Sequence, residues 1–166
     1  MSKVLVFDIE TTGLFPLRDR VTCICGGIWG ANSVPVCFSG DFEAKIISDF
    51  VKYVVASGAD KILSYNGWSF DVPFLRVRAM KNNVKLPGIF WQDNSLIDPF
   101  HVLCRNMKGK QSDFAQLLGQ DCFGSGLECL DWFTKGDFES IEKHCASDVV
   151  VLDSIYSSMI SAGFEG

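Results

Sequence analysis

No apolar run in the 166-residue sequence approaches the roughly 20 residues that a membrane-spanning helix needs. The N-terminus also lacks the long apolar segment of a secretory signal peptide, because Asp8 and Glu10 interrupt the only candidate. An excess of positive charge is missing too, since the net charge is −5 and the pI is near 4.9. We therefore expect a cytoplasmic or nucleoplasmic protein that does not coat duplex nucleic acid through bulk electrostatic attraction.

The sequence contains no Cys-x-x-Cys pair, although it has seven cysteines. Their odd number and scattered positions argue against a zinc site or a disulfide framework. We expect free thiols that fill the core as small apolar side chains. These cysteines are Cys23, Cys25, Cys37, Cys104, Cys122, Cys129 and Cys145.

Length and composition predict a single domain over residues 1–166, with 48% hydrophobic and 21% charged residues. Hydrophobic periodicity and turn residues predict a mixed α/β fold, in which strands come first and helices last. The expected strands are 4–10, 21–29, 34–38, 61–65 and one within 89–97, with a hairpin turn at Gly30–Ser33. The expected helices are 41–57, one capped by Ser69 that ends near residue 82, one from Pro99, and helices between 137 and 162.

The first strand ends in two acids. Val4–Phe7 is apolar on both faces, which is typical of a buried strand in an α/β sheet. Asp8 and Glu10 share one face at its carboxyl end, where such sheets bind ligands. Two neighbouring, partly buried carboxylates are costly unless a cation holds them, and Mg²⁺ or Mn²⁺ prefers oxygen ligands. The alternative is that both acids leave the core and point into water.

Two further acidic positions lie at the ends of predicted elements. Asp71 falls in the first turn of a predicted helix, where the helix dipole would favour a carboxylate even without a function. His144 and Asp148 are four residues apart, so they share one face of a predicted helix. An ordinary exposed ion pair would have the same spacing.

Together these segments resemble the DEDD superfamily of 3′→5′ exonucleases. The matching motifs are Phe7–Leu14, Asn66–Leu75 and His144–Asp148, in the order of the family. The second motif looks most like those of the exonuclease domains of family B DNA polymerases. Family members carry either a histidine five residues before the last aspartate or a tyrosine four before it. This chain has Lys143 at the first position and His144 at the second, so it looks like the tyrosine branch with histidine in place of tyrosine.

The resemblance implies an RNase H-like α/β fold, a mixed β-sheet of about five strands flanked by helices. It also implies a metal-dependent exonuclease that releases nucleoside 5′-monophosphates from the 3′ end of DNA or RNA. Two Mg²⁺ or Mn²⁺ ions would act on the attacking and leaving oxygens. Asp8, Glu10, Asp71 and Asp148 would hold these ions, with Asp8 bridging them, and His144 would accept the proton of the attacking water.

The same resemblance implies a set of contacts to single-stranded nucleic acid or 3′ ends. The threonines would meet the 3′ hydroxyl, the leucine would wedge against the end bases, and the aromatic side chains would stack on bases or simply pack in the core. The residues are Thr11, Thr12, Leu14, Asn66, Trp68 and Phe70. A cluster of Arg76, Arg78, Lys81 and Lys85 either follows phosphates or forms a solvated helix face.

Two other functions remain open. The chain could be a catalytically inactive, RNase H-like module that only binds nucleic acid. Asp8–Thr12 is also near the Asp-x-Asp-x-Thr pattern of haloacid-dehalogenase phosphatases, in which the first aspartate is a nucleophile. Glu10 replaces the second aspartate of that pattern, and a convincing downstream lysine or Gly-Asp pair is missing from the sequence.

Overall fold

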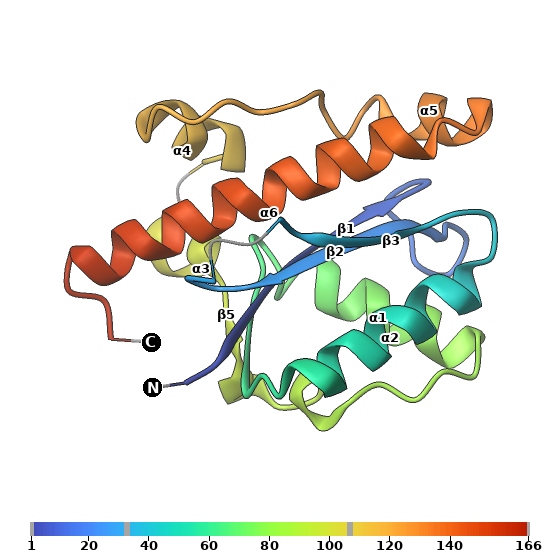
Figure 1. Cartoon of the computed structure of the whole chain (residues 1–166), viewed down its shortest axis with the longest axis horizontal. Helices are drawn as coiled ribbons and strands as arrows, with labels where there is room; N and C mark the ends of the chain where they lie inside the picture. The colour runs from blue at the N-terminus through green and yellow to red at the C-terminus, as the bar shows by residue number, and fades with distance from the viewer. Residues whose placement is uncertain (1, 32–33, 106–107, 166) are drawn as a thin grey trace.

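A mixed five-stranded sheet forms the centre of the computed structural model, which describes residues 2–31, 34–105 and 108–165. The strand order is β3-β2-β1-β4-β5 (Figure 1). This architecture confirms the expected α/β class. The strands are β1 (Val4–Thr11), β2 (Val21–Ile28), β3 (Val36–Ser39), β4 (Lys61–Leu63) and β5 (Leu96–Ile97).

Helices cover both faces of the sheet (Figure 1). The helices α1 (Glu43–Ser57) and α2 (Asp71–Lys81) pack on one face, and the 24-residue helix α6 (Phe138–Ser161) crosses the other. Two short helices, α4 (Gln111–Leu117) and α5 (Cys129–Lys135), pack against α6, while α3 (Pro99–Leu103) follows β5. Among the helices of the described residues, none is both long enough and apolar enough to cross a bilayer.

Strand β1 lies in the middle of the sheet, antiparallel to β2 and parallel to β4. Its side chains alternate as the sequence predicts. Leu5 and Phe7 point into the core beneath α1 and α2, whereas Val4 and Val6 point into the core beneath α6. The alternation therefore directs the acids that follow, Asp8 and Glu10, toward the α6 face.

One sequence prediction about an element end is wrong. Helix α2 begins at Asp71 with Phe70 in the cap position, so Ser69 is not the N-cap. The strand predicted within 89–97 is confirmed but short: two 3₁₀ turns, 88–90 and 93–95, lead into the two-residue β5. The Ser95 hydroxyl closes these turns by donating to the carbonyls of Ile89 and Gln92, and a sequence pattern does not reveal such local competition. Of the predicted hairpin turn, residues 32 and 33 lie outside the described residues.

The predicted basic cluster is wrong for one of its four residues, because Arg78 is buried while Lys81 and Lys85 are exposed. Only 2% of Arg78 is exposed, and its guanidinium donates to both carboxylate oxygens of Glu43 on α1 over 2.7 and 2.8 Å. Its remaining nitrogen donates to the Pro16 carbonyl in the loop after β1 at 2.9 Å. Arg78 therefore ties α1 and α2 to the loop that follows the first motif.

The cysteines follow the prediction only in part. Cys25 and Cys37 occupy paired positions on β2 and β3 and form a disulfide, so the expectation of seven free thiols is wrong. The strand register, which sequence spacing does not give, brings them together. Four cysteines are buried thiols as expected, and Cys122 is an exposed one; the buried four are Cys23, Cys104, Cys129 and Cys145.

Candidate active site

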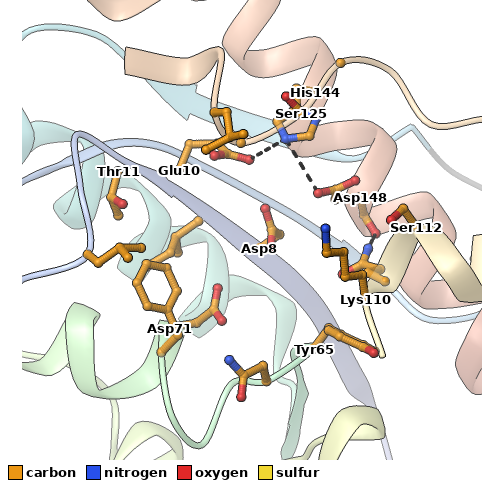
Figure 2. Close-up of a pocket in the computed structure, with 18 of the residues that line it drawn as sticks. Asp8, Glu10, Thr11, Tyr65, Asp71, Lys110, Ser112, Ser125, His144 and Asp148 are labelled. Atoms are coloured by element: carbon orange, nitrogen blue, oxygen red, sulfur yellow. Dashed lines mark hydrogen bonds and ion pairs between the residues drawn. The ribbon is translucent and has the colours of Figure 1, made fainter. Parts of the chain in front are cut away.

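A pocket of about 670 Å³ opens at the carboxyl end of β1. Residues from all three sequence motifs line it, although they come from β1, α2 and α6 (Figure 2). This is the edge at which α/β sheets place ligands, because helices and loops leave it open.

Four carboxylates meet in this pocket. Asp8 and Glu10 point from β1 toward α6, Asp71 is the first residue of α2, and Asp148 lies on α6 (Figure 2). Glu10 is 7% exposed and Asp71 only 3%, so little solvent reaches them. The structure thus brings together the four acids that the sequence singles out.

Burial and mutual repulsion make these carboxylates reluctant to ionise. Burial is the main cause that raises the pKa of Asp8 well above its ordinary value, and repulsion by the other three acids adds to it. Burial raises the pKa of Asp71 to about 7, with a contribution from Glu10. Burial also raises the pKa of Glu10 and of Asp148, while the neighbouring His144 acts in the opposite direction on both.

His144 lies between two of these acids and is 5% exposed. Its Nε2 lies 3.3 Å from Glu10 Oε1 and 3.8 Å from Asp148 Oδ2 (Figure 2). Its Nδ1 donates to the Phe123 carbonyl at 2.6 Å. Because the carbonyl can only accept, Nδ1 keeps its proton and Nε2 is the nitrogen that can exchange one at the pocket. His144 and Asp148 therefore share one face of α6, as their four-residue spacing predicts.

Two buried thiols contact the acids, and the sequence did not predict either contact. The Cys145 thiol lies 3.5 Å from Asp8 Oδ2, and the Cys129 sulfur on α5 lies within 4.8 Å of a Glu10 carboxylate oxygen. Cys145 is the residue after His144, so its position on α6 could have suggested a contact with the sheet. Cys129 carries no such signal, because the packing of α5 beside β1 is a tertiary feature.

Most of the predicted substrate-contacting residues line the pocket. Thr11, Thr12, Leu14, Asn66 and Phe70 do so. The Thr11 hydroxyl donates to the Gly13 carbonyl and the Thr12 hydroxyl accepts from the Arg20 N–H, so both hydroxyls shape the loop itself.

Trp68 lies outside the pocket, and 37% of its surface is exposed. Asp98 fixes the turn that contains it, since this carboxylate accepts hydrogen bonds from the N–H groups of Asn66 and Trp68. Asn66 adopts a left-handed conformation with φ of 57°. The turn therefore directs Asn66 into the pocket and Trp68 away from it.

The opposite wall contains residues that the motifs do not include. It is formed by the start of α4 and the segment before α5, and Lys110 lies there on the same side as Asp148 (Figure 2). The loop sequences in this region have no hydrophobic periodicity, so the sequence does not predict that these residues line the pocket. The additional lining residues include Tyr65, Lys110, Gln111, Ser112, Leu127 and Leu130.

The donor set of the pocket fits divalent metal ions. Within the described residues, the only ion pairs formed by its four acids are those with His144. Carboxylate oxygens are the ligands that Mg²⁺ and Mn²⁺ prefer. A divalent cation would relieve the repulsion that raises the pKa values of these acids. Asp8, Glu10, Asp71 and Asp148 are the residues that would hold such ions.

Comparisons with known proteins agree with this geometry. Residues 5–160 match the RNase H superfamily. A DNA polymerase of Archaeoglobus fulgidus is 39% identical over 98% of this chain and 23% of its own length. An uncharacterized protein of Methanocaldococcus jannaschii is 29% identical over 87% of this chain and 86% of its own length.

The fold is also found in a solved polymerase. The family B DNA polymerase of Pyrobaculum calidifontis superposes with a TM-score of 0.80 over 96% of this chain and 25% of its own, at 18% identity. This match confirms the expected RNase H-like fold. The chain thus spans about a quarter of the length of these polymerases. The chain belongs to the RNase H superfamily and resembles the exonuclease region of family B DNA polymerases.

Proposed function

We propose that this chain is a metal-dependent 3′→5′ exonuclease that releases nucleoside 5′-monophosphates, with residues 1–166 acting as one exonuclease domain. The observation that carries the proposal is the convergence of Asp8, Glu10, Asp71 and Asp148, with His144, in one pocket. Burial raises the pKa values of all four acids, and bound divalent cations would stabilise their ionised forms. The relation to DNA polymerases supports a nucleic-acid substrate.

The four carboxylates would hold two Mg²⁺ or Mn²⁺ ions. When bound, such ions stabilise charge on the attacking and leaving oxygens of a phosphodiester. Asp8 is the best candidate for a shared ligand, because it lies between Asp71 on one side and Asp148 on the other (Figure 2). Other side chains of the pocket would position the 3′ end of the nucleic acid and transfer a proton.

His144 would accept the proton of the attacking water at Nε2. The Phe123 carbonyl holds Nδ1–H, so the ring is oriented before the substrate binds. The imidazolium that forms would be stabilised by Glu10 and Asp148, which lie 3.3 and 3.8 Å from Nε2. A proton acceptor in this position contributes about 10²–10⁴-fold to rate.

The rim of the pocket suits a single-stranded 3′ end. Leu14 is 73% exposed and Leu127 93%, so two apolar side chains face the opening from opposite walls. Lys110 supplies a positive charge beside the acids, where a phosphate of the strand would lie. Phe70 adds an aromatic surface for base stacking. The substrate is therefore DNA or RNA with an unpaired 3′ end.

The test is cleavage of 5′-labelled DNA and RNA oligonucleotides in the presence of Mg²⁺ or Mn²⁺. We expect a ladder of shortened products and free nucleoside 5′-monophosphates, and none of either after addition of EDTA. Asp8→Ala should abolish cleavage while the circular dichroism spectrum stays unchanged. Asp49→Ala is the control, because it removes a carboxylate from α1 that does not line the pocket, and this variant should cleave at the normal rate.

Three results would contradict the proposal. An unchanged rate in Asp8→Ala would remove the catalytic assignment. Binding of oligonucleotides without cleavage would favour the inactive module. Release of phosphate from small esters, without nucleotide products, would favour the phosphatase.

A further inference from the structure

Three buried side chains of different chemistry meet behind the acidic pocket. They are Glu10 on β1, Cys129 at the start of α5 and His144 on α6. A carboxylate oxygen, the sulfur and a ring nitrogen all lie within 4.8 Å of one another. Their exposed fractions are 7%, 1% and 5%, so the protein surrounds the cluster except where Glu10 and His144 line the pocket.

The spacing of these atoms suits a tetrahedral metal ion. Nitrogen and oxygen ligands lie about 2.0–2.1 Å from Zn²⁺, so two of them at a tetrahedral angle are about 3.3–3.4 Å apart. His144 Nε2 and Glu10 Oε1 are separated by 3.3 Å. The Nδ1–H of His144 is held by the Phe123 carbonyl, which is the usual outer contact of a metal-bound histidine.

The chemistry of the three donors selects the type of ion. Mg²⁺ and Mn²⁺ bind oxygen, whereas a thiolate and an imidazole together favour Zn²⁺ and similar borderline ions. The Cys129 thiol donates to the Ser125 carbonyl at 4.0 Å, and its proton is the one that a metal would displace. We propose that Glu10, Cys129 and His144 form a Zn²⁺ site that adjoins the four-carboxylate site and shares Glu10 with it.

The fourth position of this site faces the pocket. Asp148 Oδ2 lies 3.8 Å from His144 Nε2, so either this carboxylate or a water molecule would complete the tetrahedron. Zn²⁺ would engage the Nε2 lone pair and remove the proton acceptor. If the proposed exonuclease function is correct, Zn²⁺ therefore inhibits the enzyme even when Mg²⁺ is present.

The site is tested by binding, independently of cleavage. The full chain, kept reduced with a phosphine, is titrated with Co²⁺ or Cd²⁺ while the thiolate-to-metal charge-transfer band is recorded, and Zn²⁺ affinity is measured against a chromogenic chelator. We expect one metal ion per chain with a thiolate band. Cys129→Ala should abolish the band and weaken Zn²⁺ binding at least about tenfold. Cys104→Ala, a buried thiol elsewhere in the fold, should change neither.

Further variants separate this proposal from the exonuclease proposal. Asp71→Asn should retain the thiolate band while it loses Mg²⁺-dependent cleavage. Glu10→Gln and His144→Ala should each weaken Zn²⁺ binding at least about tenfold, which keeps the test valid if Cys129→Ala does not fold. Wild-type Zn²⁺ affinity in Cys129→Ala would overturn the proposal. A band that survives in Cys129→Ala but is lost in Cys23→Ala would also overturn it, because the metal would then lie among Cys23, Cys25 and Cys145.

Discussion

At the scale of single residues, His144 is the side chain whose position decides most about the chemistry. Its Nδ1 is committed to the Phe123 carbonyl, and its Nε2 faces Glu10 and Asp148. His144→Ala should therefore lower the cleavage rate by about 10²–10⁴-fold, because the attacking water loses its proton acceptor. Single-turnover cleavage of a labelled oligonucleotide measures this loss.

Lys143 is the matched control for this prediction. It occupies the five-residue position before Asp148, and its ammonium lies over the Phe123 ring on the exposed side of α6. Lys143→Ala should cleave at close to the normal rate. A loss of less than about threefold in His144→Ala would show that the histidine only supports the fold, because a proton acceptor contributes far more.

Individual site residues could be predicted from the sequence where spacing along one element fixes their direction. Asp8 and Glu10 share a strand face, and His144 and Asp148 share a helix face, so both pairs point as expected. Cys129 and Lys110 could not be predicted in this way. The packing of α5 brings Cys129 close to Glu10 behind the pocket, and the loop before α4 brings Lys110 into the pocket wall. Neither segment has a repeating pattern.

At the scale of elements, Asp98 joins the second motif to α3. Its carboxylate caps α3 by accepting from the Phe100 N–H, and it also accepts from the N–H groups of Asn66 and Trp68. Asp98→Ala should lower the free energy of unfolding by about 1–3 kcal/mol, because buried N–H groups lose their acceptor. Urea denaturation measures this change. Asp98→Asn, which keeps one oxygen, should lose less; an equal loss would argue against the carboxylate as the anchor.

The ion pair of Arg78 and Glu43 joins α1, α2 and the loop after β1. Arg78→Met should lower the free energy of unfolding by about 3–5 kcal/mol, because the buried Glu43 carboxylate would lose its partner. The double variant Arg78→Met with Glu43→Leu should recover part of this loss, since no unpaired charge is left. Lys81→Met, an exposed change on the same helix, should stay within about 0.5 kcal/mol. An Arg78→Met protein as stable as wild type would contradict the role of this pair.

Elements with a strong period were predicted well, and those closed by local contacts were not. The run Val149–Val151 alone favours a strand, but the helical spacing of Leu152, Ile155 and Met159 gave the correct helix. The strand predicted within 89–97 forms only at Leu96–Ile97, because the residues before it adopt 3₁₀ turns that the Ser95 hydroxyl helps to close. Periodicity reports which face is buried and does not report such side-chain competition.

At the scale of the whole molecule, the pocket makes stability depend on pH and on metal ions. Burial raises the pKa of Asp71 to about 7, so the folded chain holds a proton that the unfolded chain has already lost between about pH 4 and 7. Stability of the metal-free protein should therefore fall as the pH rises through this window. Glu43 affects stability in the opposite direction. Burial alone would raise its pKa, but hydrogen bonds from Arg78 and Asn82 outweigh burial and lower it, so its contribution to stability is lost only at more acidic pH.

We expect the thermal midpoint of the metal-free protein to fall as the pH rises from about 4 to 7. Added Mg²⁺ or Mn²⁺ should raise the midpoint more at the upper end of this range, because the ionised carboxylates bind the cations. Differential scanning fluorimetry measures both effects. Asp71→Asn should flatten the pH dependence. A metal-induced rise of the thermal midpoint that is equal at the lower and upper ends of this pH range would contradict the link between ionisation and metal binding.

The fold class followed from the order of strands and helices, but the arrangement within the sheet did not. Nothing in the sequence pattern places β1 between β2 and β4, and this order is what brings α2 and α6 to the same edge. The register of β2 and β3 likewise determines that Cys25 and Cys37 meet. Long-range packing set both features, and the sequence predicted neither of them.

The continuity of α6 has a consequence for how the protein loses its function. Cys145 and Val149 hold this helix against the sheet, and they alternate along it with His144 and Asp148. A fluctuation that moves His144 or Asp148 out of the pocket must also expose Cys145 and Val149 to water. Local fraying of α6 therefore cannot remove these two pocket residues while the packing of the helix on the sheet stays intact. Amide protons of residues 144–148 should exchange with deuterium only through global opening, and heat inactivation should coincide with melting of the entire chain.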